Sequence, residues 1–277
     1  MSEANPLPAW DVQAVGAENS PLIIHVPHAG TRIPADVRRG LLLADDELAT
    51  EIAKMTDWHT DGMAQDALAS SDVSATVFTN RLSRLVVDPE RLLDDREPMA
   101  AIGMGAVYRV TSGLQPLRRP DRGEEERLLN DWFHPYAAAL NQLVDETLAD
   151  HGQAVIIDLH SFPSIALPYE LDAAAARPGL CLGTDRIHTP ATLLDAAVDA
   201  FDGISGGVAE DTPFSGTYVP LPHWGRTPAV GSIMIEVRRD LYQVEPGGPL
   251  HDGYDAVVAG LARFFVAASS ARTVGVL

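Results

Sequence analysis

The chain has 277 residues, of which 46% are hydrophobic and 21% are charged. This composition supplies enough apolar side chain for a large core and excludes an intrinsically disordered chain. The formal net charge of -19 produces a surface that repels nucleic acid and anionic lipid, so we expect neither as a partner.

Hydrophobic periodicity predicts strands and helices that alternate along the chain. In chain order we expect strand 21–26, helix 45–70, strand 73–79, strand 84–87, helix 124–150, strand 154–159, strand 179–183, helix 189–201, strand 232–237 and helix 250–269. From about 91 to 121 the chain is rich in Pro, Gly and Arg and has no clear period. This stretch is predicted to be a long loop, and long loops inside compact domains are usually functional.

Several of these strands are apolar on both faces, which is typical of strands covered by helices on two sides. Together with the alternation of strands and helices, this predicts an α/β fold with a mixed, mainly parallel sheet and helices on both faces. The sequence has no internal repeat, linker or break in composition. We therefore expect residues 1–277 to form a single α/β catalytic domain.

Cysteine usage and the N-terminal residues indicate the compartment. The one cysteine, Cys181, has no partner for an internal disulfide and lies in an apolar run, so we expect an inert core thiol. The first residues lack the basic and apolar regions of a signal peptide, and no apolar run approaches the roughly 20 residues of a membrane helix. We expect a cytoplasmic protein that does not associate with membranes.

Polar side chains follow four of the predicted strands. They are His28, Asp88 with Arg91, His160 with Ser161, and Glu236 with Arg238. In open α/β sheets, ligands bind outside the carboxyl ends of the strands. We therefore predict an active site at this edge of the sheet.

Two of these residues, His28 and His160, are candidate metal ligands. A catalytic zinc ion takes three protein ligands and keeps one open position. Asp57 is the preferred third ligand because it follows Thr56, a candidate helix cap. Asp61 is the alternative carboxylate, since residues four apart share a helix face. Without a metal, each histidine would simply be hydrogen-bonded in a turn, and the two carboxylates would form a solvated acidic face.

Glu236 lies at the end of an otherwise apolar strand, where an unpaired carboxylate is costly. It is either a general base that accepts a proton from water or the partner of Arg238 in a salt bridge. Arg238 is in turn a candidate for binding substrate.

Arginines are concentrated near the candidate site although the chain is strongly acidic. Arg81, Arg84 and Arg91 flank the short strand predicted over 84–87, and Arg109 belongs to the predicted long loop. Guanidinium groups bind carboxylates through two parallel hydrogen bonds. This clustering predicts a site for an anionic substrate, and each of these arginines is also explained by an ordinary surface position.

In combination these residues resemble the N-formylglutamate amidohydrolase family. The resemblance covers the chain from about 20 to 240, in the family's order, through the motifs His25–Gly30, Thr56–Asp61, Asn80–Arg91, Val107–Arg109, Asp158–Phe162, Pro213–Tyr218 and Ile235–Arg238. It implies a zinc-exopeptidase-like (phosphorylase/hydrolase-like) fold related to carboxypeptidases and aspartoacylases. The implied activity is hydrolysis of N-formyl-L-glutamate to formate and L-glutamate in histidine breakdown.

The resemblance also implies roles for individual residues. One zinc ion would lie on His28, Asp57 and His160, Glu236 would be the general base, and Arg84 would stabilise the oxyanion. The remaining arginines would hold the carboxylates of a small anionic N-acyl amino acid, and Tyr218 would close over the site. One position departs from the family, which often has Asp-x-Asn-Arg where this chain has Glu90 before Arg91.

Two further functions stay open at the level of sequence. One is another zinc hydrolase, either an N-acyl-amino-acid deacylase or a carboxypeptidase. The other is a non-catalytic protein that binds an acidic metabolite on the same fold. Native metal identity and oligomeric state do not follow from the sequence.

Overall fold

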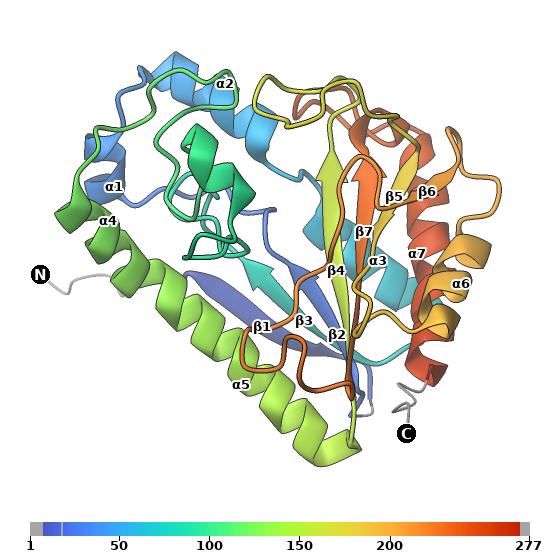
Figure 1. Ribbon diagram of the computed structural model, residues 1–277. Coiled ribbons are helices and arrows are strands. Elements are labelled where there is room, and N and C mark those ends of the chain that lie inside the picture. Colours follow the sequence, from blue (N-terminus) through green and yellow to red (C-terminus); the bar gives the residue numbers. More distant parts are fainter. Residues whose placement is uncertain (1–7, 18, 272–277) are drawn as a thin grey trace, which may run out of the picture.

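The computed structural model describes residues 8–17 and 19–271, and a seven-stranded sheet runs through that part of the chain (Figure 1). The strand order is β1-β3-β2-β4-β7-β5-β6. The strands are β1 Trp10–Val15, β2 Leu22–Val26, β3 Ala75–Asn80, β4 Ala154–Phe162, β5 Leu180–Gly183, β6 Val208–Glu210 and β7 Val230–Arg238. The central strands β3, β2, β4 and β7 are parallel, whereas β1 and β5 pair antiparallel with their inner neighbours. The mixed, mainly parallel sheet is confirmed.

Helices cover both faces of the sheet, as predicted. They are α1 Ala35–Gly40, α2 Asp45–Met55, α3 Thr60–Ser71, α4 Arg122–Leu128, α5 His134–His151, α6 Ala191–Ala200 and α7 Gly253–Ser270. One core cluster joins α3, α6 and α7 to one face through Met63, Leu193 and Leu261. A separate cluster joins α5 to the other face through Tyr136 and Leu140, and Figure 1 shows α5 and α7 on opposite sides. Because β2 and β4 are covered twice, their apolar runs are buried throughout.

The predicted helix over 45–70 is wrong, because the structure contains two helices with a break between them. Helix α2 ends with Thr56 in an extended conformation, and His59 has a φ of 68° before α3 begins at Thr60. Asp57 lies in this break, and its backbone N–H donates to the carbonyl of His28 at 3.0 Å. The break therefore follows the end of β2, and Asp57 and Asp61 do not share one helix face.

The strand predicted over 84–87 is also wrong. Residues 84–86 form a turn, in which the N–H of Val86 donates to the carbonyl of Ser83. The run is apolar because Leu85, Val86 and Val87 pack against α1, α2 and the long segment 91–121, not because they pair in the sheet. That segment is irregular as predicted, apart from a short 3-10 helix, Pro98–Ile102. The edge strand β1 was not predicted, although its apolar residues Trp10, Val12 and Ala14 alternate with Asp11 and Gln13 as in a half-buried strand.

Cys181 is fully buried in β5, and burial raises the pKa of its thiol to about 12. Both observations agree with an inert core thiol. In the part of the chain that the structure describes, no helix is both long enough and apolar enough to cross a membrane.

Gly30 brings the segment after β2 into close contact with the segment after β3, and this contact generates a prediction. A Cβ at Gly30 would lie 2.5 Å from both the carbonyl carbon of Arg81 and the carbonyl oxygen of Leu82. We expect Gly30→Ala to lower the free energy of unfolding by about 1–3 kcal/mol, because the backbone must move to make room. Urea denaturation measures the change.

Gly123→Ala is the matched control for this substitution. Gly123 lies in the first turn of α4, and its added Cβ would meet only a side-chain oxygen of Asp121 at 3.5 Å. We expect no loss there, and a gain of up to about 1 kcal/mol, because alanine favours the helix. Equal changes in the two variants would contradict the close-contact argument.

Candidate active site

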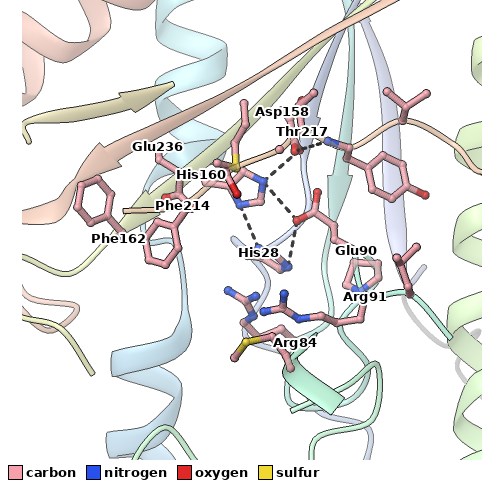
Figure 2. A pocket seen from close by; sticks show the side chains of 18 of the residues that line it. His28, Arg84, Glu90, Arg91, Asp158, His160, Phe162, Phe214, Thr217 and Glu236 are labelled. Atoms are coloured by element: carbon pink, nitrogen blue, oxygen red, sulfur yellow. Dashed lines mark hydrogen bonds and ion pairs between the residues drawn. The ribbon is translucent and has the colours of Figure 1, made fainter. Parts of the chain in front are cut away.

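A cavity of about 920 Å³ opens at the carboxyl edge of the parallel strands, where the sequence predicted a site. Six of the predicted functional residues line it: His28, His160, Glu236, Arg84, Arg91 and Tyr218. His28 follows β2, and His160 and Glu236 are register partners on the adjacent strands β4 and β7. The pairing of parallel strands therefore brings together residues that are far apart in sequence. Figure 2 shows the two imidazoles near the middle of the group.

The structure brings the three predicted metal ligands together. Nδ1 of His28 lies 3.1 Å from Nδ1 of His160, and Oδ2 of Asp57 lies 3.2 Å from His160 and 3.7 Å from His28. All three side chains are buried. Two imidazoles and one carboxylate form the donor set of many catalytic zinc sites.

The outer nitrogens of both imidazoles face carboxylates. Nε2 of His28 lies 3.0 Å from Oδ1 of Asp88, and Nε2 of His160 lies 3.1 Å from Oδ1 of Asp158. A carboxylate at Nε2 favours the tautomer with the proton on that nitrogen and turns the lone pair of Nδ1 toward Asp57. Two lone pairs and a carboxylate oxygen then converge on one point. Such a group requires a cation, and its donor chemistry fits a divalent metal ion.

The pKa shifts of His160 and Asp57 also indicate that this site requires positive charge. Burial works to lower the pKa of His160, but Glu90, Asp158 and Asp57 outweigh it and raise the pKa well above the usual value. Burial likewise works to raise the pKa of Asp57, but hydrogen bonds from His160 and His28 and the charge of Arg239 hold it below the usual range. The carboxylates therefore stay ionised in a buried position, where a proton or a metal ion must balance them.

Asp88 connects the imidazoles to the arginines. Its Oδ1 faces His28, while its Oδ2 accepts from Arg84 at 2.6 Å and from the hydroxyl of Tyr108, and Arg91 lies 3.3 Å away. Burial works to raise the pKa of Asp88, but the charges of Arg84, His28 and Arg91 keep it well below the usual value. Asp88 thus orients His28 and also fixes both guanidinium groups at the wall of the cavity.

Glu236 is the carboxylate that this network leaves without a partner. It is buried, and among the described residues its Oε2 has no hydrogen-bond partner. Burial raises its pKa to about 7, with Asp57 adding to the rise and His160 opposing it. The salt bridge to Arg238 is not formed, because Arg238 binds Asp240 at 2.6 Å and the carbonyl of Arg177. A carboxyl group that titrates near neutral pH is suited to move a proton.

Four predicted residues do not reach the cavity. Arg81 binds Asp11 at 2.6 Å and Asp61 at 2.9 Å, and all three side chains are about 40% exposed. Asp61, the alternative metal ligand, is thereby held at the surface by Arg81. Arg109 is exposed and binds Glu125 at 2.7 Å, and Arg238 binds Asp240. None of the four lines the cavity, because each is paired with a carboxylate or an arginine elsewhere on the surface.

Tyr218 does line the cavity. Its ring packs on His25, with 5.0 Å between the ring centroids, and its backbone N–H donates to Oδ2 of Asp158 at 3.1 Å. His25 itself is fully buried between Asp158 at 2.9 Å and the hydroxyl of Tyr136 at 2.7 Å. These contacts of His25 are those of a structural residue.

Arg239 is the functional residue that sequence reasoning missed. It is 3% exposed, binds Oδ1 of Asp57 at 2.8 Å and also donates to the backbone carbonyl of Ser161 at 3.0 Å. Strand alternation directed attention to Arg238, on the same face as Glu236. Strand β7 ends there, and the turn that follows carries Arg239 to the site instead. The only signal in the sequence was the pair of adjacent arginines.

The fold and the cavity define an α/β protein with a candidate metal site at the carboxyl edge of its sheet. The model of the N-formylglutamate amidohydrolase family matches residues 20–243. The chain belongs to this family, and the resemblance inferred from its motifs is confirmed.

Two relatives are bacterial enzymes named N-formylglutamate deformylase. The one from Pseudomonas putida is 32% identical over 168 residues, a stretch that spans 59% of this chain and 59% of the relative. The one from Pseudomonas aeruginosa is 27% identical over 232 residues, which cover 81% of this chain and 83% of the relative.

Two solved structures have the same fold. The N-formylglutamate amidohydrolase from Ralstonia eutropha JMP134 is 24% identical, with a TM-score of 0.77 over 93% of this chain and 96% of that one. A gene product of Agrobacterium tumefaciens is 20% identical, with a TM-score of 0.67 over 94% of both chains.

The contacts of Arg239 generate a prediction. We expect Arg239→Lys to lower the free energy of unfolding by about 1–3 kcal/mol, because an ammonium cannot serve Asp57 and the Ser161 carbonyl together and leaves a buried group unpaired. Thermal and urea denaturation measure this loss. Arg96→Lys, which retains a half-exposed pair with Asp94, should leave the free energy of unfolding nearly unchanged. If Arg239→Lys lowers the free energy of unfolding no more than this control does, the guanidinium of Arg239 is not required for stability.

Proposed function

We propose that this chain hydrolyses the amide bond of N-formyl-L-glutamate, releasing formate and L-glutamate, at a site that holds one zinc ion. The observation that carries the proposal is the unpaired carboxylate of Glu236 on the strand next to His160, beside the buried group of His28, Asp57 and His160. The activity in the names of the two relatives supports the same substrate.

His28, Asp57 and His160 would hold the metal ion. When bound, the ion supplies Lewis-acid polarisation of the amide carbonyl and lowers the pKa of water. Zinc is the metal proposed because imidazole and carboxylate ligands suit it and three protein ligands leave a coordination position open. Asp88, Asp158 and Arg239 fix the orientation of the three ligands through the contacts described above.

Glu236 would move the proton in this reaction. Its carboxylate accepts a proton from the water that attacks the formyl carbon, and the carboxylic acid then gives that proton to the leaving nitrogen as the C–N bond breaks. A pKa of about 7 supports both roles, because the group is then available in either ionisation state near neutral pH.

The arginines would bind and stabilise charge. Arg84 is the proposed stabiliser of the negative charge on the carbonyl oxygen, and Arg91 is the proposed partner of a substrate carboxylate. Both line the cavity, and the contact of Arg91 with Asp88, 3.3 Å from Nε to Oδ2, is longer than the 2.6 Å contact of Arg84. A planar guanidinium carries five donors in a fork that is suited to a carboxylate.

Three further statements stay predictions from the sequence. They are that residues 1–277 form one catalytic domain, that the protein works in the cytoplasm, and that its reaction belongs to histidine breakdown.

The metal proposal predicts the behaviour of His160→Ala. Removing one of three ligands should abolish stoichiometric zinc binding and amidase activity together. Elemental analysis of the purified variant measures the zinc, and release of formate measures the activity. His251→Ala is the control, because His251 is exposed and its ring nitrogens hydrogen-bond to the backbone carbonyl of Asp240 and the backbone N–H of Gly253. Zinc retained at one equivalent in His160→Ala would refute the ligand assignment.

The base proposal predicts the behaviour of Glu236→Gln. The amide keeps the size of the side chain but cannot accept a proton, so kcat should fall by roughly 10²–10⁴. Bound zinc and melting temperature should stay close to those of the unmodified protein. Glu245→Gln is the control, since Glu245 is half-buried against Ser164 and does not line the cavity. Normal turnover by Glu236→Gln would favour a role in binding over a role in catalysis.

A further inference from the structure

The cavity is much larger than N-formylglutamate requires. Its volume of about 920 Å³ lies near the upper end of the roughly 300–1,000 Å³ of pockets that bury drug-sized ligands. His28, His160 and Glu236 line only part of it. Apolar side chains line much of the rest, among them Phe133, Ala137, Phe162, Phe214, Trp224 and Met234.

Part of this apolar wall lies close to the proposed base. Phe162 and Phe214 pack edge to face, with 5.7 Å between their ring centroids. The carbonyl of Phe214 accepts from the thiol of Cys181 at 3.1 Å, and Cys181 is the register partner of Glu236. Figure 2 shows both rings beside Glu236. A substrate whose amide reaches Glu236 therefore has an aromatic surface next to it.

Exposed apolar side chains also line the cavity. Leu93, Leu171 and Leu221 are 46%, 64% and 48% exposed, and the exposed carboxylates of Asp94 and Asp172 line it beside the first two. Single exposed leucines are ordinary, but several along one cavity mark a surface that can bind an apolar group.

Among the arginines of the cavity, Arg91 is the one held most loosely by a carboxylate of the protein. Arg84 and Arg239 are paired with Asp88 and Asp57 at 2.6 and 2.8 Å, whereas Nε of Arg91 lies 3.3 Å from Asp88. Glu90 lies 3.3 Å from His160 and places a negative charge on the same side as Arg91. A second substrate carboxylate placed on this side of the cavity would therefore face Glu90.

We propose that this site also hydrolyses N-formyl amino acids that carry one carboxylate and a bulky apolar side chain, which binds against Phe214. The inference rests on the proposed function, because it uses the same base and the same candidate metal site. The oxygen of a water molecule adds to the formyl carbon, and the C–N bond breaks. A proton from that water passes to the nitrogen, so that formate and the free amino acid leave. Arg91 holds the single carboxylate.

The first experiment compares three substrates of the zinc-loaded protein: N-formyl-L-glutamate, N-formyl-L-phenylalanine and N-formylglycine. We expect kcat/KM for N-formylphenylalanine to exceed that for N-formylglycine by at least about 10-fold, since burying an aromatic side chain strengthens binding in the transition state. Cleavage of N-formylglutamate with no advantage of phenylalanine over glycine would overturn this inference alone. No cleavage of any of the three would overturn the proposed function and this inference with it.

The second experiment locates the apolar side chain. Phe214→Ala should lower the ratio of kcat/KM for N-formylphenylalanine to that for N-formylglycine by about 5-fold or more. Phe214→Leu should recover part of that ratio, because it restores apolar area. A ratio taken within one variant does not depend on how much of the protein is folded.

Leu250→Ala is the control for Phe214→Ala. Leu250 is 42% exposed and does not line the cavity, so its loss removes apolar surface elsewhere. We expect it to leave the ratio unchanged. An unchanged ratio in Phe214→Ala as well would show that the side chain does not bind there and would overturn the assignment.

Discussion

Carboxylates buried around His28 and His160 impose the constraint on which this site depends. Asp57, Asp88 and Asp158 are almost inaccessible to solvent, and each lies within hydrogen-bond distance of an imidazole nitrogen. Ionised groups are expensive to bury unless opposite charges and hydrogen bonds compensate them. The arrangement is therefore stable only with positive charges at its centre and at its edge. At the edge these charges are the guanidinium groups of Arg84 and Arg239. At the centre they come from a metal ion or from protons on the imidazoles.

The elements around the sheet place these carboxylates and imidazoles close together. The parallel strands β2, β4 and β7 end at one edge, which brings His28, His160 and Glu236 within reach of one another. The break between α2 and α3 then brings Asp57 to the end of β2. A continuous helix would have kept Asp57 in regular backbone, so the predicted helix fails at the residue that the site needs. Local rules are often violated at functional positions for this reason.

The network also distinguishes a carboxylate that orients its neighbours from a carboxylate that can transfer a proton. The carboxylate of Asp88 contacts Arg84, Tyr108 and His28 at the same time, so its role is to orient these three side chains. Among the described residues, Oε2 of Glu236 has no hydrogen-bond partner, and burial raises the pKa of Glu236 to about 7, with His160 opposing the rise and Asp57 adding to it. Carboxylates on neighbouring parts of one sheet edge thus differ in chemistry because their surroundings differ. Glu90 adds a further negative charge near the imidazoles, at the position where this chain departs from the family pattern.

The sequence by itself determined the class of fold, the edge of the sheet that carries the site, and the residues His28, His160 and Glu236 that lie there, but it left Asp57 and Asp61 as alternatives. These follow from apolar runs and from the polar residues that end them, which are local patterns. The sequence did not determine which arginines face the cavity. The long side chain of an arginine can pair with any carboxylate that the folded chain brings close to it. Arg81, Arg109 and Arg238 found such partners away from the cavity, while Arg239 entered the site through the turn after β7. Only the tertiary structure decided these pairings, since each partner comes from a different element or turn whose position depends on the whole fold.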